Sequence, residues 1–177
     1  MSTALITGAS SGIGEDIARQ LAARGLNLIL VARRKELLDK LADELAASHG
    51  ITTTALACDL ADRQSLGALF DEVDSTLAQY NDILTVLVNN AGTTKFCAHQ
   101  DLDGLSKDDF LHLYAVNTVG PYQMTRAAEK ALRQAGTAQV INMASIAGLA
   151  GVGSSIAYAA SKGALVTMTR SLARVMG

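Results

Sequence analysis

The sequence predicts an α/β fold in which a parallel sheet has helices on both faces. One observation is a series of short, nearly continuous apolar runs, which is typical of strands covered on both sides. These runs are TALIT (3–7), LNLILVA (26–32), TTALAC (53–58), LTVLVN (84–89) and AQVINM (138–143). The other observation is that amphipathic helical patterns separate the runs. Repeated strand-helix-strand units of this kind build a parallel sheet between two helical layers.

Helical periodicity marks the segments between these strands. Apolar residues recur every four residues in one segment, and at i, i+3, i+4 and i+7 in the next. The two sets are Leu37, Leu41 and Leu45, and Leu66, Leu69, Phe70, Val73 and Leu77. A further helix is expected to start at Ser106, with Asp109 as its capping-box partner. A last helix is expected over residues 154–175.

Length and composition fit one domain over residues 1–177, long enough to bury a sizeable core. The net charge is −2 and no basic stripe is present, which argues against nucleic acid and anionic membranes as partners. No signal peptide and no 18-residue apolar run is present, so we expect a cytoplasmic protein without a membrane span. Cys58 and Cys97 match no metal or disulfide spacing and are interpreted as free thiols.

A glycine-rich loop follows the first apolar run and opens a helix. The sequence TGASSGIG (7–14) includes Gly8, Gly12 and Gly14, with Ser10, Ser11 and Ile13 between them. Glycines at these positions allow a tight turn, close approach of a diphosphate, and close packing of helix on strand. The pattern predicts nucleotide binding, and a purely structural turn is the alternative.

The end of the second strand selects between the two dinucleotide cofactors. A carboxylate there would accept hydrogen bonds from ribose hydroxyls, whereas this chain has Arg33 and Arg34. An arginine fork suits a 2′-phosphate, so NADP(H) is preferred and NAD(H) stays possible. The alternative is that both arginines form an ordinary solvated helix start. After the third strand, Asp59 could hold the adenine amino group beside Leu60, or Asp59 or Asp62 could cap the next helix.

Tyr158 and Lys162, in the stretch YAASK, share one face if residues 154–175 are helical. A free phenol titrates at about 10, so acid/base work near neutrality needs roughly 4 kcal/mol in favour of the phenolate. A lysine charge about 6 Å away supplies roughly 2 to 3 kcal/mol at an effective dielectric of about 20. A second positive charge, such as an oxidised nicotinamide, would close the gap.

With these motifs together, the chain resembles the short-chain dehydrogenase/reductase family, in the branch whose glycine loop is Thr-Gly-x-x-x-Gly-x-Gly. The resemblance covers the whole length and includes the thirteen residues from Ser145 to Tyr158. The motifs are TGASSGIG, CDL, NNAG (89–92), VNTVG around Asn117, INMAS ending at Ser145, and YAASK. It implies a three-layer Rossmann-like fold with strand order 3-2-1-4-5. Thr85 departs from the pattern, since many relatives have Asp there and Asp82 lies earlier; we treat this as functionally silent.

The resemblance also implies residue roles. Tyr158 would exchange a proton with the substrate oxygen, and Ser145 would hold that oxygen. Lys162 would bind the nicotinamide ribose and favour the phenolate, while Asn117 would position a water linking Lys162 to solvent. Asn90, Ala91 and Gly92 would line the cofactor path. Three alternatives rest on the residues alone: Ser145 as a strand-end cap, Asn117 as a helix-kink residue, and Asn89 as a contact between strands.

The activity implied is hydride transfer between NADP(H) and a small carbonyl or alcohol substrate, in a homodimer or homotetramer. Relatives continue past the tyrosine helix with further strands and a substrate lid, so we expect residues 1–177 to be a domain truncated before that lid. Three explanations stay open: a fragment of a longer protein, a partner that supplies the missing surface, or a natural truncation. The alternative function is a non-catalytic NADP-binding or interaction module.

Overall fold

The computed structural model describes residues 2–177, apart from the side chain of Arg63. The chain forms two compact units. The first contains the residues up to Ala91 together with Met124–Ile141, and the second contains Gly92–Gln123 and Asn142–Gly177. The single domain expected over residues 1–177 stays a prediction.

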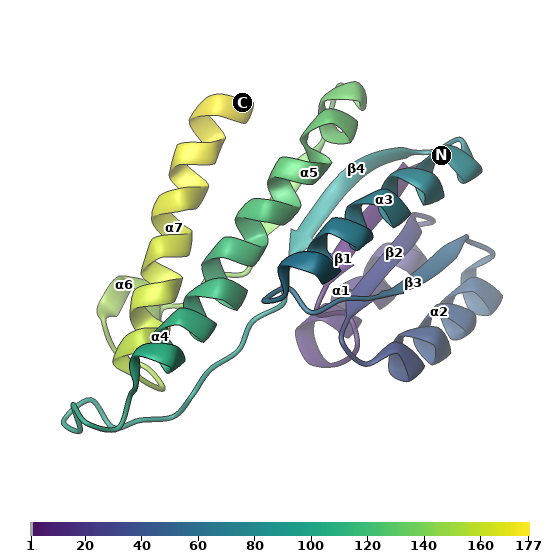
Figure 1. The fold of residues 1–177 in the computed structure, drawn as a ribbon. Coiled ribbons are helices and arrows are strands. Elements are labelled where there is room, and N and C mark those ends of the chain that lie inside the picture. Colours follow the sequence, from purple (N-terminus) through teal and green to yellow (C-terminus); the bar gives the residue numbers. More distant parts are fainter. Residues whose placement is uncertain (1) are drawn as a thin grey trace. The chain divides into compact units, whose positions relative to one another are not determined.

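The strands form a five-stranded sheet in the order β3-β2-β1-β4-β5, of which Figure 1 labels β1 to β4. Neighbouring strands from β3 to β4 pair in parallel, with Thr7 opposite Val31 and Ala32 opposite Ala57. The strands are β1 (Ser2–Thr7), β2 (Asn27–Ala32), β3 (Thr53–Ala57), β4 (Ile83–Asn89) and β5 (Gln139–Asn142). All five predicted strands and the predicted order are confirmed.

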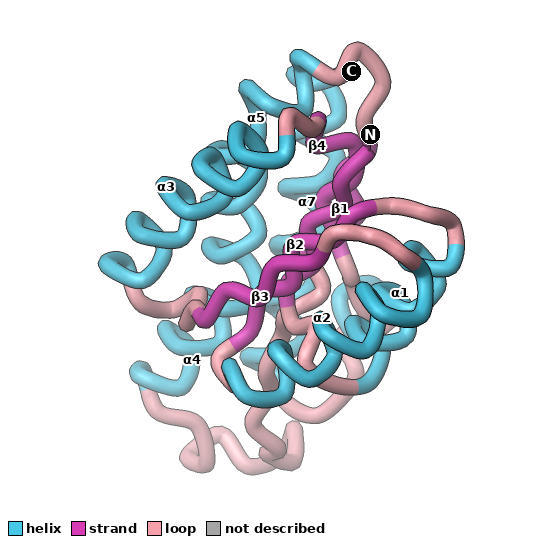
Figure 2. The backbone as a smooth tube through the Cα atoms, turned by 90° about the vertical axis from the view of Figure 1, so that its right-hand side faces the viewer, coloured by secondary structure: helices cyan, strands magenta, loops and turns pink. Residues whose placement is uncertain are grey.

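Helices cover both faces of this sheet. Helices α1 (Gly12–Ala23) and α2 (Lys35–His49) lie on one face, where their alanines and leucines pack against β1 and β2. Helix α3 (Arg63–Tyr80) lies on the other face (Figure 2). Helix α5 (Gly120–Gln134) contributes to that second layer, because side chains of α3 and α5 line one small apolar pocket with residues of β1 and β4.

The buried faces of these helices differ in one detail from the predicted pattern. Helix α3 buries Leu66, Leu69, Val73 and Leu77 as its periodicity predicts. In α2 the helix is confirmed, but Leu37 is 42% exposed and Leu38 is fully buried. Leu37 and Leu38 are adjacent in the first turn of this helix, and leucine spacing alone does not show which of them faces the sheet.

The second unit is mainly helical. Its elements are α4 (Lys107–Tyr114), a π-helical turn η1 (Ala115–Val119), the first residues of α5, α6 (Ala147–Ala150) and α7 (Ile156–Met176). The predicted capping box is present: Ser106 Oγ accepts from the Asp109 amide at 3.1 Å, and Asp109 Oδ2 accepts from the Ser106 amide at 2.8 Å. Helix α6 contacts α7 at a glycine, since a Cβ on Gly148 would lie 2.5 Å from the Lys162 carbonyl carbon.

Candidate active site

The glycine loop forms a tight turn at the carboxyl end of β1. Gly8 has φ of +69° and donates its amide to Val31 O at 2.7 Å, which holds the loop against β2. A Cβ on Gly14 would lie 2.3 Å from Gly8 O and 2.5 Å from Asn90 Nδ2. Only glycine fits at residue 14, because the first turn of α1 is pressed against the backbone of the loop.

The amino end of α1 fits a diphosphate. Ser11 is the N-cap residue of α1, but its side chain accepts no hydrogen bond from the helix. The first backbone amides of α1 are therefore not capped by the Ser11 side chain. A Cβ on Gly12 would meet nothing within 4 Å, and Ile13 is 61% exposed. Open amides at a helix amino end bind anions well, because the helix dipole adds to their hydrogen bonds.

The two arginines after β2 have different environments. Arg34 donates to Ser10 Oγ at 3.1 Å and to Ser11 Oγ at 2.7 Å, so it is engaged with the glycine loop. Arg33 is exposed, and within residues 2–177 its guanidinium has no hydrogen bond or ion pair. Of these two arginines, Arg33 is therefore the one whose guanidinium donors are all available to a ligand.

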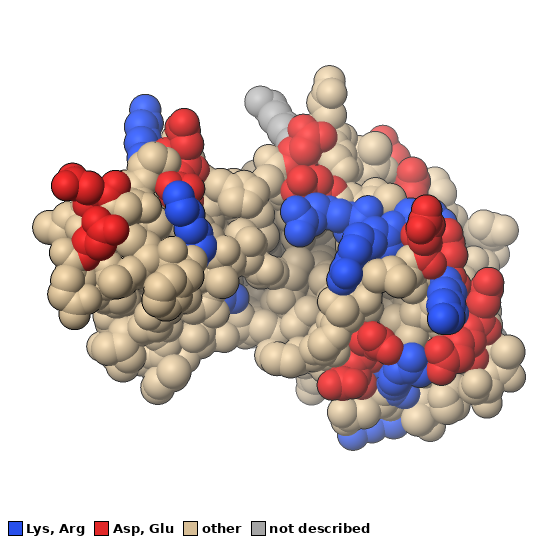
Figure 3. All heavy atoms as spheres, turned by 90° about the horizontal axis from the view of Figure 1, so that it is seen from below, with Lys and Arg blue, Asp and Glu red and all other residues tan. Residues whose placement is uncertain are grey.

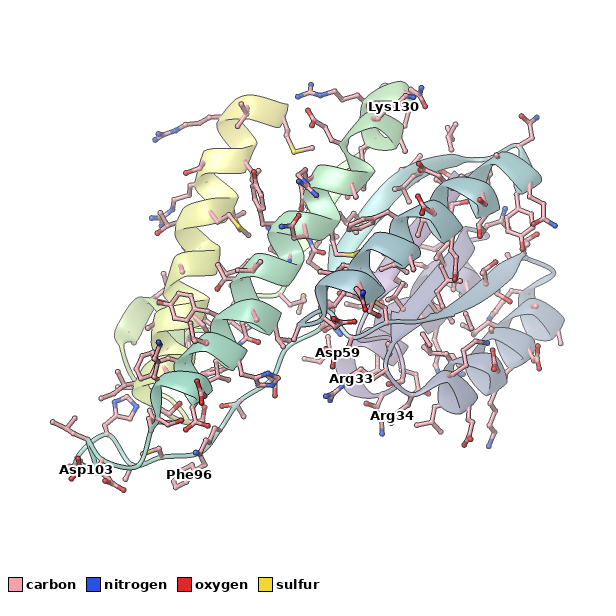
Figure 4. All side chains as sticks on the ribbon, in the orientation of Figure 1. Arg33, Arg34, Asp59, Phe96, Asp103 and Lys130 are labelled. Atoms are coloured by element: carbon pink, nitrogen blue, oxygen red, sulfur yellow. The ribbon has the colours of Figure 1, made fainter. Side chains whose placement is uncertain are left out.

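Asp59 lies at the same edge of the sheet as Arg33, because Cys58 donates its amide to Ala32 O at 3.0 Å. Figure 4 shows Arg33, Arg34 and Asp59 on the segments that follow β2 and β3. Asp62, not Asp59, is the N-cap of α3. Asp59 Oδ1 instead accepts from the Ala61 amide at 2.9 Å, and the neighbouring Leu60 is buried.

Asn90 and Thr7 join the ends of β1 and β4. Asn90 Nδ2 donates to Thr7 O at 3.1 Å and to Gly8 O at 3.2 Å. Thr7 Oγ1 accepts from the amides of Asn90 and Ala91, both at 3.1 Å. These bonds fix the backbone at the start of the NNAG segment. Asn89 has a different partner, since its Nδ2 donates to Thr125 Oγ1 on α5 at 3.3 Å.

Tyr158 and Lys162 lie one turn apart on α7, in the second unit. Ser155 caps this helix by accepting from the Tyr158 amide at 3.2 Å. The Tyr158 hydroxyl has no hydrogen-bond partner within the described residues, so it is available to a ligand. The Lys162 ammonium is buried and donates to Met143 O at 2.6 Å. Burial lowers the pKa of Lys162, because removal from water disfavours the charged form.

Ser145 lies two residues after the carbonyl that Lys162 contacts. Its Oγ accepts from the Ala147 amide at 3.2 Å, and its own carbonyl accepts from the Gly148 amide at 3.0 Å. This contact lies between β5, which ends at Asn142, and α6. It uses Ser145 as an acceptor, and in the part of the chain described here the hydroxyl proton has no acceptor.

Asn117 lies in the π-helical turn η1 and is fully buried. Its Oδ1 accepts from the Thr93 amide at 2.8 Å, and its Nδ2 donates to Thr93 O at 2.9 Å and to Ser161 Oγ at 3.0 Å. The helix irregularity considered as an alternative is thus present, and π-helical turns are frequent at functional sites. The spacing of the sequence motifs does not indicate that Asn117 contacts Thr93 and Ser161.

The predicted catalytic residues Asn117, Ser145, Tyr158 and Lys162 all belong to the second unit. The predicted cofactor residues up to Ala91 belong to the first unit, and Gly92 belongs to the second. Sequence reasoning missed Thr7, Thr93 and Ser161 as partners of these residues. Thr7 is the first residue of TGASSGIG, and Ser161 is the fourth residue of YAASK.

On the face shown in Figure 3, Lys and Arg side chains and Asp and Glu side chains are both present, and a group of Lys and Arg side chains has Asp and Glu side chains beside it. Cys58 and Cys97 are free thiols, and burial raises the pKa of Cys58. The described residues contain no helix with the length and apolar character that a membrane span needs.

A parallel sheet in this order, with a glycine turn between β1 and α1, defines the dinucleotide-binding class of α/β proteins. Within that class the chain belongs to the short-chain dehydrogenase family, since the family model for short chain dehydrogenase matches residues 2–177. It is 38% identical over 175 residues to ketoacyl reductase 2 of the granaticin polyketide synthase of Streptomyces violaceoruber, covering 98% of this chain and 67% of that protein.

Two solved structures show the same fold with different cofactors. A short-chain dehydrogenase from Sphingobium yanoikuyae in complex with NADPH is 30% identical, with a TM-score of 0.87 over 99% of this chain and 66% of that one. An NAD⁺-bound xylitol dehydrogenase is 26% identical, with a TM-score of 0.88 over 99% of this chain and 65% of that one. The chain spans 60% of the length of another curated relative, L-xylo-3-hexulose reductase of Hypocrea jecorina.

Proposed function

We propose that this protein is an NADP(H)-dependent oxidoreductase that interconverts a carbonyl compound and its alcohol, with Tyr158 as general acid/base. The observation that supports this most is the buried Lys162 ammonium one helical turn from Tyr158, bonded to Met143 O at 2.6 Å. Burying an ammonium costs free energy, and one neutral carbonyl compensates it only in part. The buried charge of Lys162 is explained if it stabilises the Tyr158 phenolate and binds the nicotinamide ribose.

The first unit supports binding of the cofactor. The open amides at the start of α1 would bind the diphosphate, and the close approach of Gly14 to Gly8 O leaves no side chain in the way. Arg33, with its donors free, would bind the 2′-phosphate of NADP(H), next to Arg34 and the Ser10 hydroxyl. Asp59 and Leu60 would border the adenine. NAD(H), which lacks the phosphate, would bind more weakly.

In the direction of reduction, bound NADPH supplies a hydride to the carbonyl carbon. The Tyr158 hydroxyl donates its proton to the carbonyl oxygen, so one hydride and one proton convert the carbonyl into an alcohol. Ser145 donates a hydrogen bond to the same oxygen, using the hydroxyl proton that has no acceptor among the described residues. The Lys162 charge stabilises the phenolate left behind until solvent returns a proton.

The substrate proposed is a small molecule, and the carbonyl class includes ketones, aldehydes and 3-oxoacyl thioesters. The curated relative from Streptomyces violaceoruber is named a ketoacyl reductase. The one from Hypocrea jecorina is named a hexulose reductase. We also propose a homodimer or homotetramer formed through the helices that begin after Ser106 and Ser155.

The test is an NADPH-oxidation assay of the full chain against a panel of ketones, aldehydes and 3-oxoacyl thioesters. Oxidation that depends on one of these carbonyl compounds supports the proposal. NADPH binding, seen as a change in its fluorescence, with no carbonyl-dependent oxidation across the panel would contradict it. That second outcome is the one expected of a non-catalytic NADP-binding module.

A further inference from the structure

Ser161 is a buried hydroxyl between the two residues of the catalytic pair. It lies three residues after Tyr158, directly before Lys162, and has no exposed surface. Its Oγ accepts from Asn117 Nδ2 at 3.0 Å and donates to Tyr158 O at 2.8 Å. The hydroxyl thus connects the side chain of Asn117 with the turn of α7 that begins at Tyr158.

The orientation of Asn117 depends on this contact. Its Oδ1 and one hydrogen of Nδ2 pair with the backbone N–H and C=O of Thr93, at 2.8 and 2.9 Å. The second hydrogen of Nδ2 goes to Ser161 Oγ. Because Asn117 is fully buried, water cannot replace a lost acceptor without a rearrangement. Ser161 is therefore the side-chain acceptor that completes the bonding of the amide.

A second bond joins the same two elements. Thr118 Oγ1, on η1, donates to the backbone carbonyl of Ser161 at 3.0 Å. Two successive residues of the π-helical turn thus hold α7 at one residue, through its side chain and through its backbone. Thr93, the other partner of Asn117, directly follows the NNAG segment in the sequence.

Packing alone does not explain a serine here. Alanine has higher helix propensity than serine and nearly the same size, and the two preceding residues of the helix, Ala159 and Ala160, are alanines. A buried hydroxyl costs free energy unless it is hydrogen-bonded, so its presence is explained by the groups it contacts. Those groups are the Asn117 amide and the Tyr158 carbonyl.

We propose that Ser161 is a positioning residue, which holds Asn117 and Thr93 in place relative to the turn of α7 that bears Tyr158. The proposal rests on the proposed function, because the position matters only if Tyr158 exchanges a proton with a substrate. Ser161 acts through Asn117 and does not touch substrate. Its hydroxyl, not merely its small size, is what the site requires.

The first experiment compares Ser161→Ala with Ser161→Thr, which restores a hydroxyl, and with Ser171→Ala as a matched control. Ser171 lies on the same helix, is exposed, and donates to Thr167 O at 3.2 Å. Ser161→Ala is expected to lower kcat about 10- to 100-fold, the scale of a misplaced reacting group, with NADPH affinity unchanged. Ser161→Thr should recover much of this, and Ser171→Ala should match wild type. Equal kcat for Ser161→Ala and wild type would overturn the proposal.

A double-mutant cycle then separates positioning from general stability. If Ser161 acts through Asn117, adding Ser161→Ala to Asn117→Ala lowers kcat no further. Independent, multiplicative losses would show that the two residues act separately and would overturn the proposal. Unfolding temperatures of all four proteins are measured in parallel.

Hydrogen exchange of the Asn117 side-chain amide tests the positioning role of Ser161 without any measurement of turnover. In an NMR spectrum of the protein, the side-chain amide of Asn117 should exchange slowly with solvent, because both hydrogens are bonded and buried. Ser161→Ala should make this exchange at least tenfold faster, while Ser171→Ala leaves it unchanged. Unchanged exchange in Ser161→Ala would overturn the positioning role. Wild type that shows the slow amide but no carbonyl-dependent NADPH oxidation would contradict the proposed function alone.

Discussion

The carboxylate of Asp82, just before β4, accepts a hydrogen bond from Asn27 Nδ2 at the start of β2, at 2.7 Å. The same oxygen accepts from Thr3 Oγ1 of β1, the strand between them, at 2.6 Å. Asn27 in turn accepts from the Thr52 amide at 2.8 Å. One carboxylate thus joins the amino ends of three neighbouring strands, at the edge of the sheet opposite to the glycine loop. Asp82, which lies three residues before Thr85, therefore has a structural role at this edge of the sheet.

We expect Asp82→Ala to lower the free energy of unfolding by about 2 to 3 kcal/mol, because Thr3 and Asn27 would be buried without their acceptor. Burial opposes the charge on Asp82, but hydrogen bonds from Thr3 and Asn27 and from a backbone amide outweigh it and lower its pKa. A carboxylate with a lowered folded-state pKa stabilises the fold above its unfolded value of about 4. This stabilisation is lost as the pH falls through the lowered value.

Urea denaturation at a series of pH values measures this. The difference between wild type and Asp82→Ala should be constant at neutral pH and shrink below about pH 4. Asp39→Ala is the matched control, since Asp39 pairs with Lys35 on the exposed surface of α2 and should change stability by less than about 0.5 kcal/mol. A pH-independent difference for Asp82→Ala would show that the charge is not what stabilises the strands.

Gly14→Ala should impair both folding and nucleotide binding. The new Cβ would lie 2.3 Å from Gly8 O, so the first turn of α1 has to move away from the loop. We expect a loss of about 1 to 3 kcal/mol in the free energy of unfolding and a weaker NADPH complex. Gly67→Ala, in the open middle of α3, should instead stabilise the protein by about 0.5 to 1 kcal/mol. Equal effects of the two substitutions would contradict the close packing at Gly14.

Arg33→Asp should separate the two cofactors. Replacing the free guanidinium with a carboxylate removes the donors for a 2′-phosphate and adds repulsion, so NADPH affinity should fall about 10- to 100-fold. NADH affinity should change little, because its ribose has hydroxyls that a carboxylate can accept from. Fluorescence titrations with both cofactors measure this. Equal weakening of NADPH and NADH would show that Arg33 does not bind the phosphate.

Much of the fold was predictable because the apolar runs and capping residues in the sequence match the strands and helix starts of the structure. Continuous apolar runs marked all five strands, and the capping box at Ser106 and Asp109 marked the start of α4. The face of α2 was less certain, because Leu37 and Leu38 are adjacent and only tertiary packing selects Leu38. The π-helical turn around Asn117 has no periodicity of its own, since it inserts into an otherwise regular helical pattern.

The sequence predicts candidate site residues, but it does not predict the contacts that these residues make. The geometry of a tight turn explains the spacing of the loop glycines, and helix geometry explains why Tyr158 and Lys162 share one face. The partners of Arg34 in the glycine loop and of Lys162 at Met143 O depend on side-chain conformations and on segments distant in sequence. Ser161 is part of the YAASK motif, but its contacts with Asn117 and with the Tyr158 carbonyl, which explain why it is serine, appear only in the structure.

The central claim, that Tyr158 is the proton donor for hydride transfer from NADPH, is tested most directly by Tyr158→Phe. This change removes one hydroxyl that has no partner within the described residues, so the fold should tolerate it. Carbonyl-dependent NADPH oxidation should fall at least about 100-fold, as expected for loss of a general acid, while NADPH binding by fluorescence titration stays largely intact. Turnover by Tyr158→Phe at the wild-type rate would contradict the account.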